Sequence, residues 1–527
     1  MNNLINFNNL YANLAQSSYE GRPYSFDKRL RTVDEYAIID YSDSELGIIE
    51  KVNGGTTLPN NGILYLHKEN IEQYDNVYET ATEKNIKTFE NDDEGFKSYY
   101  LTDTETLNLK TKNVYISVKG SDEPSFLSLN DWLLNDVPFA LRNEYIPQAK
   151  LTKMAVKKVL SEMRENAPTS KLNLTGHSLG TIATIQGVAN LSVEELEQIG
   201  EIVLFNGPDA SKSIKKMNIS DEKLKILNEK VTYYVNPFDV VSMLNRNTDT
   251  QIGKVKVIVP FNFSTTFDKP SSHDFGEYRI HSDGKILEAT EEFFPDYISA
   301  GKKLSELINK YVYIINAQQG VDATALIEGG KFLVKEFLSL LAIPTDIKYL
   351  YSEFMKEYKA IIDETKQAVI AWGNKNIPIL QAAIQSATGA KKIELRSRLL
   401  LCISHLSRIE SDEKVKLMKN ELENYRQQVK EVVEKANREA YHAGITLGRN
   451  EVSQLVSHFQ FSTVWDEGMF SYNVDELNRY MDKIVRFSDK LFTAVETLED
   501  IDRKQSELFK VVSNSSFSLN SYKIERG

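Results

Sequence analysis

The stretch KLNLTGHSLGTIATIQGVANL, residues 171–191, decides the fold of the first half of the chain. Its opening, KLNLT, has the short apolar run of a strand, and TIATIQGVANL has the pattern of a buried helix. Between them, Gly176-His177-Ser178-Leu179-Gly180 matches the pattern G-x-S-x-G. In a strand–turn–helix context this pattern makes a tight, strained turn that lifts the serine hydroxyl out of the sheet. We therefore predict that Ser178 is a nucleophile, against the alternative of a simple tight turn.

Composition limits the class of protein. Of the 527 residues, 41% are hydrophobic and 10% are aromatic, which is enough for packed cores. The formal net charge of -12 argues against nucleic acid as a partner, because nucleic-acid-binding proteins show a basic surface. No uncharged apolar stretch reaches the roughly 18 residues of a membrane-spanning helix. We therefore expect a soluble, multidomain protein, with an enzyme as the leading class.

Metal and disulfide chemistry are disfavoured as well. The single cysteine, Cys402, excludes an intrachain disulfide and a cysteine-based zinc site. The sequence also has no dense Asp/Asn/Gly loop of EF-hand type. We predict no metal ion and no other cofactor.

Periodicity divides the chain into two parts. Before about residue 290, short β-branched or aromatic runs alternate with helical stretches; examples are NVYISVKG (113–120), EIVLFNG (201–207) and KVKVIVP (254–260). This alternation indicates βα units and a mostly parallel sheet. After residue 290 the pattern becomes helical. We therefore predict an α/β domain over residues 1–290 and an elongated all-α domain over residues 291–527.

Two long amphipathic helices are expected in the all-α part. Apolar residues recur with heptad spacing over 415–436, through Met418, Tyr425 and Val432, and a second such stripe covers 481–501. In one interpretation the two helices pack on each other within a bundle. In the other, their stripes form a seam for partner helices from another chain.

A serine nucleophile needs a base, and the base needs an orienting carboxylate. Hydrolases built on this turn order them Ser, then Asp or Glu, then His. We favour His273 as the base, because it lies in a loop that can reach Ser178, over His281 in a predicted hairpin strand. For the carboxylate, Asp239 follows the second strand after the turn, with Asp209 as the alternative. Asp239 could instead only cap a short helix.

Acyl transfer also develops an oxyanion, which preorganised N–H donors must stabilise. We predict the backbone N–H of Leu179 as one donor, because it directly follows the nucleophile. Ser121 is the second candidate, since it follows the strand NVYISV at a point where Gly120 lets the chain turn.

Four motifs, in this order, resemble the class 3 lipases, the fungal-type lipase family of α/β-hydrolases. They are VKGSD (118–122), SLNDWLLND (128–136), GHSLG (176–180) and NPFDVV (236–241), the last followed by a loop with His273 and Tyr278. YANLAQSSY (11–19) resembles the opening helix of the family. The resemblance implies an α/β-hydrolase fold, a triad of Ser178, Asp239 and His273, and an oxyanion hole at Ser121 and Leu179. It departs from the usual pattern at Lys119, where the family most often has arginine.

The second motif resembles the lid of these lipases or the Trp-Asp motif beside it. Apolar side chains crowd this segment, and the lid candidates are Leu129, Trp132 and Leu133. A lid with an apolar inner face opens when lipid can replace its contacts. The alternative is ordinary core packing of a short helix.

An N-terminal lipase joined to a long helical region, without a Sec-type signal peptide, resembles lipase toxins exported by the type VII system of Gram-positive bacteria. The order of the two domains is reversed in this chain, because the helical targeting domain of those toxins usually comes first. It implies secretion without a Sec signal peptide, and otherwise we expect a cytoplasmic protein. It also implies membrane phospholipid as the substrate, small helical partner proteins on the C-terminal domain, and an immunity protein.

The leading hypothesis is therefore a serine phospholipase A that acts as a secreted antibacterial toxin. A soluble carboxylesterase with a helical oligomerisation domain is the first alternative. A non-enzymatic hydrolase-like scaffold for partners is the second, and acyltransferase or thioesterase chemistry at the same site remains beside them.

Overall fold

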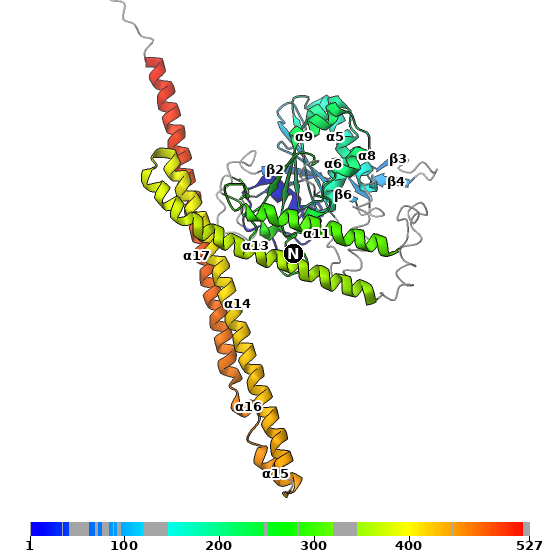
Figure 1. Cartoon of the computed structure of the whole chain (residues 1–527). Helices are drawn as coiled ribbons and strands as arrows, with labels where there is room; N and C mark the ends of the chain where they lie inside the picture. The colour runs from blue at the N-terminus through cyan, green and yellow to red at the C-terminus, as the bar shows by residue number, and fades with distance from the viewer. Residues whose placement is uncertain are drawn as a thin grey trace, which may run out of the picture. The chain divides into compact units, whose positions relative to one another are not determined.

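The chain folds into two compact units, Met1–Gln367 and Ala368–Gly527 (Figure 1). The computed structural model describes residues 2–33, 35–41, 63–68, 72–75, 84–87, 89–91, 96–120, 146–246, 251–281, 284–319, 345–444 and 446–519.

A mostly parallel sheet forms the centre of the first unit. Its strand order is β1-β2-β6-β7-β8-β9-β10-β11. Strands β7 to β11 pair in parallel, whereas β1, β2 and β6 continue the sheet beyond β7 in antiparallel fashion. The strands span Tyr36–Asp40 (β1), Ile63–His67 (β2), Phe96–Thr102 (β6), Asn113–Val118 (β7), Lys171–His177 (β8), Ile199–Phe205 (β9), Val231–Val235 (β10) and Lys254–Val257 (β11). The prediction of a mostly parallel α/β sheet is therefore confirmed.

Three short antiparallel strands extend the sheet at β6. Strand β5 pairs with the first residues of β6, and β4 and β3 follow it in order. They span Glu72–Asp75 (β3), Lys84–Lys87 (β4) and Glu90–Asn91 (β5).

Both faces of the central parallel strands are buried, because the crossover helices that connect such strands cover the sheet. On one face, Leu174 of β8 and Leu204 of β9 are fully buried. Side chains alternate along a strand, so Val203 and Phe205 point to the other face, where they share a core with Ala12 and Ala15 of helix α1 (Leu10–Ser17).

Helices of the first unit lie before, between and after the strands in sequence. Helix α5 buries Leu151, Ala155 and Val159 along one face, and its proline takes the first helical position, where no backbone donor is lost. The other helices are α2 (Phe26–Leu30), α6 (Leu179–Ala189), α7 (Val193–Gln198), α8 (Ser211–Lys216), α9 (Asp221–Lys230), α10 (Val240–Met243), the 3-10 helix η5 (Phe275–Glu277) and α11 (Asp296–Gln319); α5 spans Pro147–Asn166.

The boundary between the units differs from the boundary at residue 290 expected from sequence. Helix α11 packs on α10 and β11, and Tyr297 of α11 contacts the ring of Phe238. Helix α13 (Thr345–Ser386) begins in the first unit, where Phe354 and Tyr358 are buried. The described residues of 291–319 and 345–367 thus pack with the α/β unit, although their periodicity is as helical as that of the second unit.

Two long antiparallel helices dominate the second unit (Figure 1). Ser404 contacts Ser488 while Arg426 contacts Glu467, so residue numbers rise along one helix as they fall along the other. The two long helices are α14 (Gly389–Ala443) and α17 (Glu467–Leu519), and the short helices α15 (Arg449–Val456) and α16 (Phe461–Val464) lie between them in the sequence. Within the described part of the chain, none of the helices is both long enough and apolar enough to cross a membrane.

Some residues of the predicted heptad stripe of α14 are buried and others are exposed. Val415 is 4% exposed and lies on the side that packs on α17. Met418, Tyr425 and Val432 are 53%, 58% and 62% exposed, so this pairing leaves part of the stripe open. The helical character predicted for this region is confirmed, and packing between the two helices accounts for the other part of the stripe.

The buried centre of β8 gives a stability prediction. Replacing Leu174 with alanine leaves a cavity between sheet and helices, which should lower the free energy of unfolding by about 2–5 kcal/mol. Native-state hydrogen exchange of β8 peptides measures this loss. The matched control Leu109→Ala, at a side chain 78% exposed, should change it by less than about 0.5 kcal/mol. Equal effects of the two substitutions would contradict the central place of β8.

Candidate active site

Ser178 occupies the turn between β8 and α6 in a conformation that L-residues rarely adopt. Its φ is 56° and its ψ is -131°. Such strain costs on the order of 1–3 kcal/mol and persists only where the surroundings hold it. Here the backbone N–H of Ser178 donates to the carbonyl oxygen of Phe205 on β9 at 3.1 Å. The serine is half-buried at the carboxyl end of the central strand, as the nucleophile turn requires.

Both glycines of the G-x-S-x-G pattern are required by close backbone approaches. A Cβ on Gly176 would lie 2.8 Å from the carbonyl oxygen of Gly180. A Cβ on Gly180 would lie 2.5 Å from the carbonyl oxygen of Val118, the last residue of β7. Helix α6 can therefore begin directly against β7 only because neither position has a side chain.

Asp239 and His273 form a buried pair. Oδ2 of Asp239 lies 2.9 Å from Nδ1 of His273, and the two side chains are 0% and 2% exposed. This contact fixes Nδ1 as the nitrogen that faces the carboxylate, which leaves Nε2 on the far side of the ring. The structure thus brings together the acid and the base that were predicted from sequence.

The Asp239 carboxylate is also the N-cap of helix α10. It accepts hydrogen bonds from the backbone N–H groups of Val241 and Ser242 at 3.1 and 3.0 Å. It accepts two more from the hydroxyls of Ser242 at 2.5 Å and Thr266 at 3.2 Å. The capping role was the alternative to an orienting role, and the geometry combines both, because the cap fixes the direction in which the carboxylate faces His273.

His273 is held against the serine turn through its own backbone. Its carbonyl oxygen accepts from Nε2 of His177 at 3.2 Å and from Nδ2 of Asn206 at 3.3 Å. The rings of His177 and His273 have centroids 4.5 Å apart. Because His177 directly precedes Ser178 in the chain, these contacts hold the loop of His273 beside the nucleophile turn.

His177 itself has a defined protonation state, which was not foreseen from its place inside the motif. Its Nε2 faces a carbonyl oxygen and so carries the proton, and its Nδ1 accepts from the hydroxyl of Tyr19 at 2.9 Å. Burial, followed by the nearby His273, lowers the pKa of His177 well below its usual range. Tyr19 lies at the end of the predicted opening helix segment, and nothing in that segment indicated this contact.

The alternative residues lie in other surroundings. Asp209 accepts from the backbone N–H and the hydroxyl of Ser211 at 3.0 and 2.6 Å. The backbone N–H of His281 donates to the carbonyl oxygen of Lys285, within the antiparallel turn expected there. The carboxylate that pairs with His273 is therefore that of Asp239.

The oxyanion-hole prediction is only partly described by the structure. Leu179 is the first residue of α6, where backbone N–H groups have no partner within the helix. A Cβ on Gly120 would lie 3.1 Å from Cβ of Ser178, so the chain leaving β7 passes beside the nucleophile. Ser121 follows directly, but it lies outside the described residues, as do the lid candidates Leu129, Trp132 and Leu133.

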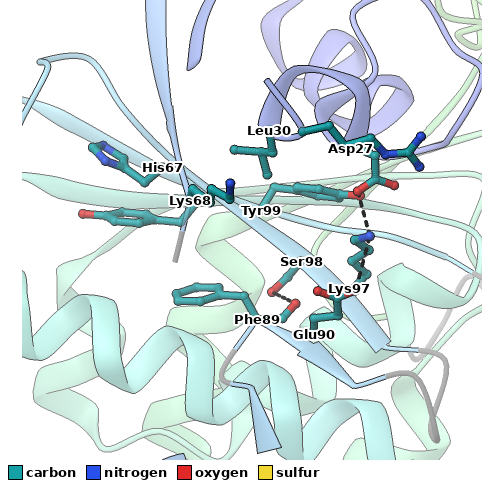
Figure 2. A pocket seen from close by; sticks show the side chains of 11 residues that line it. Asp27, Leu30, His67, Lys68, Phe89, Glu90, Lys97, Ser98 and Tyr99 are labelled. Atoms are coloured by element: carbon teal, nitrogen blue, oxygen red, sulfur yellow. Dashed lines mark hydrogen bonds and ion pairs between the residues drawn. The ribbon is translucent and has the colours of Figure 1, made fainter. Parts of the chain in front are cut away.

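A cavity of about 340 Å³ lies elsewhere in the first unit (Figure 2). Strands β2 and β5 pair with different parts of the same edge of β6, and the cavity opens between them beside Ser98 and Tyr99. Three of its charged side chains pair with one another, because Nζ of Lys97 lies 2.7 Å from Asp27 and 3.5 Å from Glu90. Neither the Asp239–His273 pair nor Ser178 lines this cavity.

The parallel sheet, with a strained serine turn after its central strand and a buried Asp–His pair, gives the first unit an α/β-hydrolase fold. Residues 142–265 match a family model described as "Alpha/beta hydrolase of unknown function (DUF900)". This segment includes Ser178 and Asp239 and ends before His273. Neither a curated protein nor a solved structure matches the chain. The family match supports hydrolytic activity, while the resemblance to class 3 lipases and to type VII lipase toxins stays a prediction.

The state of His177 gives a prediction about pH. Its pKa is depressed in the folded protein, so below about pH 6.5 the unfolded chain binds a proton that the folded chain does not. The unfolding free energy should therefore fall as the pH drops through this range, with a contribution from His177 of up to about 1.4 kcal/mol per pH unit. Urea unfolding between pH 7.5 and 5.0 measures the slope. His177→Gln should flatten it, whereas the control His442→Gln, on the exposed surface of α14, should keep the wild-type slope.

Proposed function

We propose that this protein is a serine lipase of phospholipase A type that hydrolyses acyl esters of membrane phospholipids with Ser178, Asp239 and His273. The observation that carries the proposal is the 2.9 Å contact between Asp239 and His273. The loop of His273 is hydrogen-bonded to His177, the residue before the strained Ser178. Sequence order and strand position support all three residues, and hydrogen bonding supports the pairing of Asp239 with His273.

The chemistry follows from this arrangement. Nε2 of His273 takes the proton of Ser178 as Oγ attacks the ester carbonyl carbon, and Asp239 stabilises the resulting imidazolium. The backbone N–H of Leu179 and a donor at Ser121 stabilise the oxyanion. His273 then gives its proton to the departing lysophospholipid alcohol. Water, deprotonated by the same nitrogen, releases the fatty acid and restores Ser178.

The proposal that the substrate is a lipid rests on features of the sequence. The four motifs shared with class 3 lipases include an apolar lid-like segment over 128–136, which suits an enzyme that meets its substrate at an interface. The helical second unit suits a secretion and partner-binding role, because Met418, Tyr425 and Val432 are exposed with heptad spacing. The proposal therefore extends to a toxin exported by a type VII-like route, with small helical partner proteins and an immunity protein.

Fatty-acid release from phosphatidylcholine and phosphatidylglycerol vesicles tests the proposed activity. The purified full chain should release fatty acid and lysophospholipid, measured by mass spectrometry. Ser178→Ala should lower the rate by at least about 10³-fold, because the nucleophile is removed. Ser161→Ala, at an exposed serine of α5, is the matched control and should keep the wild-type rate.

The outcomes separate the competing functions. Full activity of Ser178→Ala would contradict the assignment of the nucleophile. Hydrolysis confined to short, water-soluble esters and lost in Ser178→Ala would favour the carboxylesterase with a helical oligomerisation domain. A wild-type chain inactive toward every lipid and ester would favour a non-enzymatic scaffold.

A further inference from the structure

Helix α13 places a tyrosine hydroxyl directly behind the Asp239–His273 pair. Tyr358 is fully buried, and burial raises the pKa of its hydroxyl, so the group stays protonated. The hydroxyl donates to the carbonyl oxygen of Phe238, the residue before Asp239. It accepts from the backbone N–H of Thr266 at 3.0 Å.

Thr266 connects this hydroxyl to the carboxylate. Oγ1 of Thr266 lies 3.3 Å from the hydroxyl of Tyr358 and 3.2 Å from Oδ1 of Asp239. The same Oγ1 accepts from the backbone N–H of Val240 at 2.8 Å. One threonine therefore joins the tyrosine, the carboxylate and the start of helix α10.

The histidine loop meets the same network. The hydroxyl of Ser272, the residue before His273, donates to the carbonyl oxygen of Phe238 at 2.9 Å. It also lies 3.2 Å from Oγ1 of Thr266. The carbonyl of Phe238 is therefore shared by Tyr358 and Ser272, so a single buried network fixes both residues of the acid–base pair.

Contacts with neighbouring elements hold Tyr358 in place. On α13, Glu357 accepts from Lys310 and Tyr311 of α11, each at 2.7 Å. The ring of Phe354 packs on Tyr358 with centroids 5.6 Å apart. Nζ of Lys366 lies 5.5 Å from the ring centroid of Phe263, near the other end of this part of the helix. Contacts on both sides of Tyr358 therefore hold this part of α13, and with it the tyrosine hydroxyl, in place.

We propose that Tyr358 is a positioning residue for the Asp239–His273 pair, so that helix α13 is part of the active site of the hydrolase. This rests on the proposed role of the pair in catalysis. The tyrosine is 120 residues from Phe238 in sequence and touches no reacting atom. It acts by fixing the backbone before Asp239 and the threonine that bonds its carboxylate, and through them the orientation of His273.

Tyr358→Phe tests the proposal, because it removes the hydroxyl and keeps the ring. Hydrolysis of a short-chain ester by the full chain should show kcat lowered on the order of 10–100-fold, since a small misplacement of catalytic groups has effects of this size. KM should stay within about twofold, because the tyrosine does not contact substrate. Rates are expressed per folded molecule, with the folded fraction measured by circular dichroism, so that a loss of stability alone leaves kcat unchanged.

Tyr349→Phe is the matched control. It removes the hydroxyl of a tyrosine on the same helix whose side chain is 65% exposed, so kcat should stay within about twofold of wild type. Thr266→Val breaks the link independently and should reproduce the selective loss of kcat, whereas Thr266→Ser keeps the hydroxyl and should restore most of it. The double variant Tyr358→Phe/Thr266→Val should lose less than the product of the two single losses, because both act through one network.

A kcat of Tyr358→Phe within twofold of wild type, or a loss equal to that of Tyr349→Phe, would overturn the proposal. A failure of the proposed function is distinguishable, because the wild-type chain itself would then show no serine-dependent ester hydrolysis.

Discussion

The buried contact between Asp239 Oδ2 and His273 Nδ1 is the interaction on which the rest of the site depends. The carboxylate is desolvated, so it persists there only because five groups satisfy it: the histidine, two N–H groups at the start of α10, and the hydroxyls of Ser242 and Thr266. Each of these donors also fixes the direction in which the Asp239 carboxylate points. The cap of a four-residue helix and the orientation of a histidine are therefore one structural feature.

A second constraint is the crowding of backbone around Ser178. Strand β7, strand β8 and helix α6 approach so closely that a Cβ at Gly120, Gly176 or Gly180 would meet backbone atoms at 2.5–2.8 Å. The same crowding holds the serine at φ 56°, which points its hydroxyl away from the sheet. Burial of His177 as a neutral ring then links this turn to the loop of His273. The turn at Ser178 and the Asp239–His273 pair are thus held together by contacts that involve no substrate.

Much of this arrangement could be predicted from sequence because its signals are local. The glycine spacing around Ser178, the strand before it and the order Ser–Asp–His follow from chain direction and backbone sterics. The role of Tyr358 could not be predicted, because a tyrosine on an amphipathic helix has the same pattern whether it packs in a core or bonds a distant loop. For the same reason the periodicity after residue 290 gave no sign that residues 291–367 belong to the first unit. The exposure of part of the α14 stripe could not be predicted either, since heptad spacing does not tell which residues face the partner helix.

Reaction with a serine-directed fluorophosphonate probe tests most directly the central claim that Ser178 is activated by the Asp239–His273 pair. The probe reacts with an activated serine whatever the natural ester, so its result is independent of the substrate. Peptide mapping of the labelled full chain should place one adduct on Ser178, with the rate of labelling lowered on the order of 10³-fold or more in His273→Ala. An unlabelled Ser178, or equal labelling rates for the wild type and His273→Ala, would contradict the account.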